Sequence, residues 1–445
     1  MRSIAIATLV VCTIAMLPAR GLLAATSRGG IISQSTALKH GLVRDWYAHV
    51  EIDGARDRVL HAVVDRDSVF FQSELGLVEN VDAATGRQLW IREIGRQIDP
   101  VLPLHATDAW VAVIGGPRLY LLDRASGHVE FVRRFDGVAS AGPSVSALRV
   151  YVPLMQGPLE SFQLPMADDA AKTGVGQLPP RTFPWKHFSS GSVVGGLLLT
   201  PQAIAWATDR GYFYISELNS RQPLYRVEIG DDIVVPLAYH QPLIYGASLG
   251  GFVYAVDETT GSVTWRVSLG SPIRVAPAMV RDRLYVCPDR RGMYCFDASQ
   301  GGELWWAPRA IRFVAASPTR IYASDAAHRL LILDAQTGAR LGMLPTQNLS
   351  LAVSNVATDR IFLGTPSGSI QCLHEIELTE PVRHWQKATE KQPDAPDKEP
   401  ESGETTPAAG DQPTAGEAEP DQRDPFGGDD QDPFGGEDRD PFGDE

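Results

Sequence analysis

The sequence predicts an all-β fold, an eight-bladed β-propeller of four-stranded antiparallel blades. Two observations support this prediction: a motif recurs about every 40 residues, and a further apolar run of strand length precedes most copies. A period near 40 residues with about four short strands is typical of one propeller blade. The apolar stripe with a 3.6-residue period that a helical repeat would need is not visible.

The motif consists of Gly, an apolar strand, Asp, two residues, Thr-Gly and, four residues after the Gly, an aromatic residue. Its clearest copy runs from Gly251 through Asp257 and Gly261 to Trp265. The Asp position is occupied in turn by Asp82, Asp123, Gln163, Glu217, Asp257, Asp297, Asp334 and His374. Six of the seven intervals are 37 to 41 residues and the third is 54, so we expect eight blades.

Each part of the motif has a physical role in a hairpin. The Asp carboxylate can accept backbone N–H groups two or three residues on, and the Gly can adopt positive φ without steric cost. The aromatic residue then begins the next strand. We therefore interpret Trp90, Trp265 and Trp305 as core between blades rather than as platforms for a cofactor.

A ring of blades must also close, because an unpaired strand edge invites aggregation. Residues 45–52, which include Trp46, resemble the aromatic strand around Trp90 but precede the first complete unit. We expect them to add to the last blade and join the two ends of the ring. Residues 382–385 are a competing candidate for this role.

The N-terminus indicates export. Arg2 precedes an apolar run at residues 4–17, and Leu23-Ala24-Ala25 offers small residues for cleavage. We predict a signal peptide at 1–25, a linker at 26–41, the propeller at 42–386 and a tail at 387–445, with an uncleaved N-terminal anchor as the alternative. No later run can span a membrane and no Cys follows at a lipid-attachment position, so we expect a periplasmic or cell-envelope protein without lipid anchor.

The net charge of −14 belongs to the tail, because residues 386–445 hold 5 basic and 19 acidic residues and the remainder is neutral. A neutral body argues against nucleic acid as a partner. The tail should be disordered, since it has almost no aliphatic residues. Three Asp-Pro-Phe-Gly copies place Phe426, Phe434 and Phe442 at intervals of 8 residues, which predicts either multivalent recruitment of a partner or a solubilising acidic brush.

Residues that could support catalysis or metal binding have simpler interpretations. Cys287, Cys295 and Cys372 remain after signal removal, and we interpret them as buried apolar residues on strands. Ser248 lies in a Gly-x-Ser-x-Gly pattern, but between two strands, where a nucleophile elbow needs a strand and a helix. We therefore predict no catalytic, cofactor-binding or metal-binding residue.

The longest interval contains an insertion within residues 166–191 that exceeds the regular period by about 14 residues. Insertions in repeat folds map to loops, often on the binding face. Trp185 and Phe188 are therefore candidate partner-binding residues. Two alternatives stay open: the loop is inert, or Trp185 is the displaced structural aromatic of its unit.

The Asp-x-x-Thr-Gly-x-x-x-Trp units resemble the repeats of pyrroloquinoline-quinone-type β-propellers, over residues 42–385. Size and blade number are most similar to the BamB-type scaffold of outer-membrane β-barrel assembly. The other branch of this family, the quinoprotein dehydrogenases, carries the quinone with calcium. Those enzymes commonly have adjacent cysteines and long loops around the cofactor, which this chain lacks. The chain also departs from the BamB type, in the missing lipid-attachment Cys and the added acidic tail.

The resemblance implies a non-enzymatic exported scaffold that binds protein partners, including envelope or outer-membrane assembly components. We expect a monomer with no cofactor. The alternative is a quinoprotein dehydrogenase, and pyrroloquinoline quinone with calcium is expected only in that case.

Overall fold

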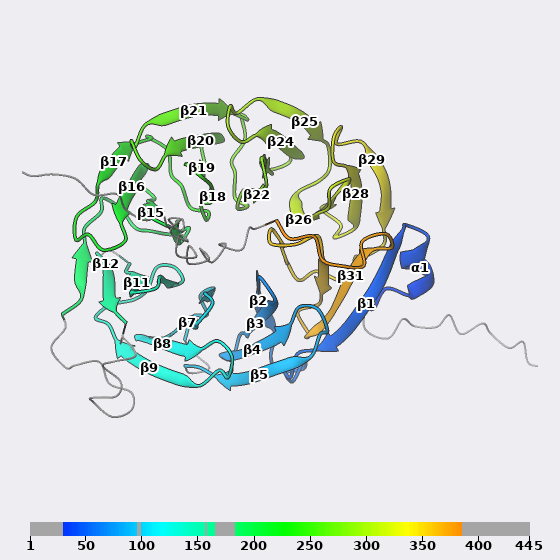
Figure 1. Cartoon of the computed structure of the whole chain (residues 1–445), viewed down its shortest axis with the longest axis horizontal. Coiled ribbons are helices and arrows are strands. Elements are labelled where there is room, and N and C mark those ends of the chain that lie inside the picture. Colours follow the sequence, from blue (N-terminus) through cyan, green and yellow to red (C-terminus); the bar gives the residue numbers. More distant parts are fainter. Residues whose placement is uncertain (1–29, 96–98, 156–157, 165–182, 385–445) are drawn as a thin grey trace, which may run out of the picture. The chain divides into compact units, whose positions relative to one another are not determined.

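The computed structural model describes residues 30–95, 99–155, 158–164 and 183–384. All of them lie in one compact unit, Met1–Ala388, and the second unit, Thr389–Glu445, is outside the described residues. Within the first unit, eight antiparallel sheets follow one another around a ring (Figure 1), which confirms the predicted propeller. Among the described residues seven sheets have four strands and one has three. None of the helices in these ranges is long and apolar enough to cross a membrane.

The first four blades follow the chain in order, each from its inner to its outer strand. Blade 1 comprises β2 (Val59–Asp65), β3 (Ser68–Ser73), β4 (Leu77–Asp82) and β5 (Gln88–Glu93). Blade 2 comprises β6 (His105–Ala106), β7 (Trp110–Gly115), β8 (Arg118–Asp123) and β9 (Val129–Arg134). Blade 3 comprises β10 (Ser144–Val145), β11 (Arg149–Pro153), β12 (Leu159–Gln163) and β13 (Trp185–His187). Blade 4 comprises β14 (Leu197–Leu199), β15 (Ala203–Ala207), β16 (Tyr212–Glu217) and β17 (Tyr225–Glu228).

The remaining blades continue the same pattern until the ring closes. Blade 5 comprises β18 (Ala238–His240), β19 (Leu243–Ala247), β20 (Phe252–Asp257) and β21 (Val263–Ser268). Blade 6 comprises β22 (Ala278–Val280), β23 (Arg283–Val286), β24 (Met293–Asp297) and β25 (Glu303–Ala307). Blade 7 comprises β26 (Arg312–Ala316), β27 (Arg320–Ser324), β28 (Leu330–Asp334) and β29 (Arg340–Leu344). Blade 8 comprises β30 (Ile361–Gly364), β31 (Ser369–Glu375) and β1 (Leu42–His49).

The repeated Asp residues form turns, as predicted. The carboxylate of Asp257 accepts the backbone N–H groups of Thr259 and Thr260 at 2.8 and 2.9 Å, and Gly261 has φ +67°. A Ser or Thr hydroxyl two or three residues on also donates to each of these carboxylates, and the hydroxyl bonds, together with the backbone bonds, lower the pKa of Asp123, Asp257, Asp297 and Asp334. Because every such turn joins the third and fourth strands, all lie on one face of the ring, which we call the Asp–Gly face.

In five of the joints an aromatic residue of the outer strand joins its blade to the next one, an arrangement we call the latch. In the joint of blades 6 and 7, the Trp305 indole N–H donates to the Ala335 carbonyl at 3.0 Å. Its ring lies against Gly338, where an added Cβ would stand 2.5 Å from the ring. Glycine is required there both by its φ of +69° and by this contact. The same latch is made by Trp46, Trp90, Tyr225 and Trp265.

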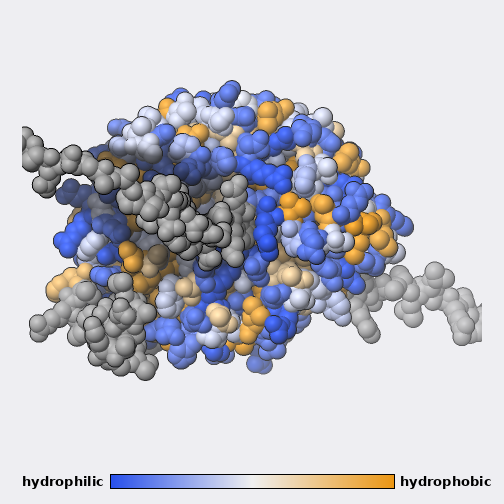
Figure 2. All heavy atoms as spheres, in the orientation of Figure 1, coloured by the Kyte–Doolittle hydropathy of each residue, from blue (hydrophilic) through white to orange (hydrophobic). Residues whose placement is uncertain are grey.

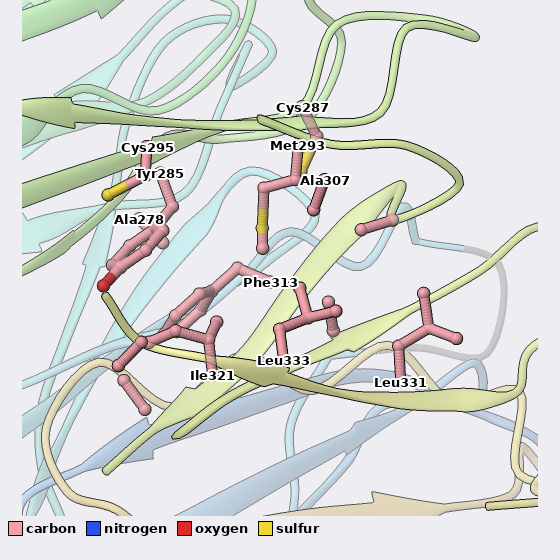
Figure 3. Packing of buried hydrophobic residues seen from close by; sticks show 14 of the residues in the cluster. Ala278, Tyr285, Cys287, Met293, Cys295, Ala307, Phe313, Ile321, Leu331 and Leu333 are labelled. Atoms are coloured by element: carbon pink, nitrogen blue, oxygen red, sulfur yellow. The ribbon is translucent and has the colours of Figure 1, made fainter. Parts of the chain in front are cut away.

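The core lies between the blades, as Figure 3 shows for blades 6 and 7. Met293 and Cys295 of blade 6 face Leu331 and Leu333 of blade 7, with Phe313 between them. The predicted burial of the cysteines is confirmed, because Cys287, Cys295 and Cys372 are buried and unbridged. Burial raises the pKa of Cys287 and Cys295 to about 12, so these thiols stay protonated and unreactive.

The first strand closes the ring. Strand β1 pairs antiparallel with β31, and Trp46 stands opposite Cys372, two residues before His374 in the motif position. Residues 382–385 are the competing candidate for the closing strand. Their Arg383 instead forms an isolated bridge with Thr358. The innermost position of blade 8 is reduced to a bridge between Leu351 and Gly364, so this blade has three strands.

The joint of blades 7 and 8 is sealed without an aromatic latch. Gly342 takes the register position of the aromatic residue, opposite Ile332. Helix α1 (Gln34–Leu38), within the predicted linker, lies beside β1 and β29 at the outer edge (Figure 1), and its Ala37 packs in the core of this joint. The Tyr322 hydroxyl adds a hydrogen bond to Glu375 at 2.9 Å.

Loss of the closing latch should destabilise the whole propeller. We expect Trp46→Ala to lower the free energy of unfolding by about 3–5 kcal/mol, the usual cost of removing a buried Trp. The neighbouring Tyr47 is exposed, so Tyr47→Ala should cost less than about 1 kcal/mol. Denaturant titration of both variants measures the difference. Equal effects would show that the latch does not hold the ring closed.

Glu79 of β4 makes the closing joint sensitive to pH. Its carboxylate is only 2% exposed and accepts the Glu51 backbone N–H at 2.8 Å, and burial raises its pKa to about 7. The folded state therefore holds a proton that the unfolded chain releases near its ordinary pKa of 4.5. Relative to Glu79→Gln, the wild type should lose roughly 3 kcal/mol of stability as pH rises from 4.5 to 7. A pH-independent difference between the two unfolding curves would contradict this assignment.

Candidate functional site

The inserted segment belongs to blade 3. It connects β12, which ends at Gln163, with β13, which begins at Trp185. Residues 165–182 lie outside the described residues, so the site consists of what borders them: the end of blade 3 and its joint with blade 4.

Trp185 occupies the register position of a latch residue. It stands opposite Ser161, two residues before Gln163, as Trp265 stands opposite Ala255 two residues before Asp257. On blade 4 the residue in the motif's Gly position is Arg221, four residues after Glu217. The Trp185 ring therefore meets a guanidinium in place of a glycine, at 5.0 Å from the Arg221 Cζ.

A second guanidinium stacks closely on the same ring. The Cζ atom of Arg149 lies 3.5 Å from the Trp185 ring centroid, and Arg149 is only 4% exposed. Its N–H groups donate to the Ser161 hydroxyl and carbonyl at 3.2 and 3.0 Å, and within the described ranges it forms no ion pair with a carboxylate. Burial, assisted by Arg221, lowers the pKa of Arg149. A buried cation held by a ring and two oxygens makes Trp185 necessary to this joint.

The interior of the joint is an aromatic stack around His187. The His187 ring lies 6.3 Å from Tyr151 and 6.1 Å from Trp206 between centroids. Burial and the charge of Arg149 lower the pKa of His187 to about 4, so the imidazole is neutral at pH 7. Its Nε2 lies 3.5 Å from the Ser161 Oγ, but Ser161 is fully buried. A substrate cannot reach this hydroxyl, so the pair does not form a nucleophilic site.

Phe188 lies at the opposite end of β13, on the face away from the Asp–Gly turns. Its side chain is 72% exposed. The register of blade 3 places Met155 at the same edge, and the Met155 N–H donates to the Val138 carbonyl at 2.7 Å. Val138, Met155, Phe188 and Val194, all exposed, form what we call the apolar rim. Figure 2 shows one face of the molecule, on which hydrophilic residues prevail and hydrophobic residues gather in small groups.

The other residues singled out from the sequence have structural roles or lie elsewhere. Ser248 is buried in the turn of the β19–β20 hairpin, where its Oγ accepts the Phe252 N–H at 3.1 Å, which confirms the predicted strand-to-strand turn. Phe426, Phe434 and Phe442 lie outside the described residues. Within the described part of the chain, no group of three or more His, Cys, Asp or Glu residues could hold a metal ion.

Sequence reasoning missed Arg149 and Arg221. A signal for Arg221 was present, since it stands where the repeat requires glycine. Arg149 carries no such signal, because an Arg at or just before the start of the second strand also occurs at Arg283, Arg320 and Arg360.

Comparison with known proteins agrees with this architecture. A family model described as outer membrane protein assembly factor BamB matches residues 74–157 and 218–400, more than half of the chain. The crystal structure of BamB from Moraxella catarrhalis is similar at 16% identity and TM-score 0.55, covering 75% of this chain and 99% of that one. The computationally designed Ika8 protein is similar at 15% identity and TM-score 0.59, covering 73% and 98%. A search of curated protein sequences found no match.

The stack on Trp185 should contribute to stability. We expect Trp185→Ala to lower the free energy of unfolding by about 2–4 kcal/mol, because the buried Arg149 loses the ring that covers it. Phe183 is 88% exposed and precedes the same strand, so Phe183→Ala should change the free energy of unfolding by less than about 0.5 kcal/mol. Thermal and denaturant unfolding of both variants test this. An unchanged stability of Trp185→Ala would show that Trp185 does not stabilise the joint and would leave partner binding as its role.

Proposed function

The chain belongs to the family of outer membrane protein assembly factor BamB, and from this premise we propose that it is a non-enzymatic, exported scaffold that binds protein partners in the cell envelope. Components of outer-membrane protein assembly are the partners we propose first. The proposal includes a signal peptide at residues 1–25, a periplasmic location and no cofactor.

The observation that supports this function best is the apolar rim. Val138, Met155, Phe188 and Val194 expose large apolar side chains at one edge of a joint whose interior is tightly packed. Exposed apolar groups on a rigid base lose little conformational entropy when a partner covers them. The rim therefore has the properties of a protein-binding surface.

The joint beneath the rim provides the rigidity. Val193 and Leu159, next to the rim, are buried in the core of the joint with Trp206. The Tyr151 hydroxyl of blade 3 donates to the Leu218 carbonyl of blade 4. A partner that binds the rim thus contacts two blades that are already fixed relative to each other. The three Asp-Pro-Phe-Gly copies in the tail, with Phe426, Phe434 and Phe442, are proposed as a separate recruiting element, since linked weak motifs raise avidity.

A matched pair of phenylalanine variants tests the rim. Proximity labelling of the exported protein should identify envelope partners in the wild type, and Phe188→Ser combined with Met155→Ser should reduce their labelling at least five-fold. The control is Phe183→Ser, which removes an exposed Phe at the other end of β13 and should leave labelling unchanged. The same partner list from all three proteins would reject the rim as the binding surface.

The tail and the dehydrogenase alternative need separate measurements. Deletion of residues 424–445 should remove part of the partner list and leave the melting temperature unchanged. An identical list would count against a recruiting role.

Addition of pyrroloquinoline quinone with calcium and an electron-accepting dye should give neither a spectral change nor dye reduction with alcohols or sugars. Either signal would replace the scaffold function with an enzymatic one.

A further inference from the structure

Blade 6 carries three arginines in the turns that flank an exposed tryptophan, on the same face as the apolar rim but separate from it. Arg290 and Arg291 lie in the turn between β23 and β24, Trp306 lies in β25, and Arg309 follows that strand. The Trp306 indole N–H donates to the Arg291 carbonyl at 2.6 Å, while 48% of its side chain stays exposed. We call these four residues the Arg–Trp rim.

The charge of the Arg–Trp rim is not neutralised locally. Within the described residues none of its three guanidinium groups forms an ion pair. The one acidic residue in the turn, Asp289, is already bound by Arg274. Because the body of the chain has equal numbers of basic and acidic residues, this cluster is a local excess of positive charge.

The backbone shows that two of these arginines occupy positions unfavourable to them. Arg309 has φ +76°, two residues after the outer strand of its blade. The same position in blades 1, 4 and 5 is Gly95, Gly230 and Gly270, with φ between +63° and +84°. Glycine adopts this conformation freely, whereas a residue with a Cβ is strained there. Arg290, with φ +58°, is a second case in the same rim. Such strain points to a use of the side chain.

We propose that the Arg–Trp rim binds an acidic, extended segment of a protein partner. Carboxylates of the segment would pair with the guanidinium groups, which favour bidentate contacts, and an apolar side chain would lie on the indole. The hydrogen bond to Arg291 fixes the Trp306 ring before binding, which lowers the entropy cost of association. Arg and Trp are also the residues most enriched in binding hot spots.

A protein segment fits this surface better than nucleic acid or a membrane. Both of those present wide arrays of phosphates and would need a broad basic field. Here the cluster offers three guanidinium groups on one blade, and the body as a whole has equal numbers of basic and acidic residues. The Arg–Trp rim goes beyond the proposed function, because it is a second surface with its own ligand chemistry.

The experiment uses the full chain and a displayed library of random 12-residue peptides. Selection on the wild type should enrich peptides with several carboxylates and one large apolar residue, and added salt should weaken their binding. Arg309→Gly should weaken it at least ten-fold, and so should Trp306→Ser. The melting temperature of Arg309→Gly should be equal to or higher than that of the wild type, since the backbone strain is relieved.

The controls separate this inference from a general loss of charge and from the apolar rim. Arg210→Ala, an exposed Arg on the same face in blade 4, should retain full peptide binding, as should Phe188→Ser. Enrichment of non-acidic peptides, or equal affinity of Arg309→Gly, would overturn the proposal. The proposal would also be overturned if Arg309→Gly abolished binding to phosphatidylglycerol vesicles but left binding of the selected peptides unchanged.

Discussion

The contact between an outer-strand aromatic ring and a glycine of the next blade is the constraint on which this propeller depends. In the joint of blades 6 and 7, the Trp305 ring covers Gly338 and its indole N–H reaches the Ala335 carbonyl. The turn that positions this glycine is itself held by Asp334. One short motif therefore sets both the hairpin within a blade and the distance to the neighbouring blade. Repetition of that motif places successive sheets side by side around the ring.

Two joints depart from the regular latch, and other contacts hold the blades together there. Where blades 3 and 4 meet, Arg221 replaces the glycine and Arg149 stacks on Trp185. Where blades 7 and 8 meet, helix α1 and Glu375 take over the sealing. At both joints the packing is retained by other means. The apolar rim borders the first of these joints.

The sequence was a good guide wherever structure depends on neighbours along the chain. The Asp-to-Gly turns are local, so their positions revealed the number of blades, and the likeness of Trp46 to Trp90 revealed the closing strand. Contacts between blades could not be obtained in this way. Nothing near Arg149 in the sequence indicates that its partner is Trp185, because the pair forms only when β11, β12 and β13 align. Phe188 was suggested by its insertion, but its neighbours in the apolar rim depend on strand register.

The closing strand also determines the order in which this protein can mature. Ile32 and Gln371, joined by a hydrogen bond in the structure, are 339 positions apart. Such a long-range contact cannot form until almost the whole domain has been synthesised, and contacts of this kind slow folding. A nascent chain therefore carries an unpaired β-edge throughout its synthesis.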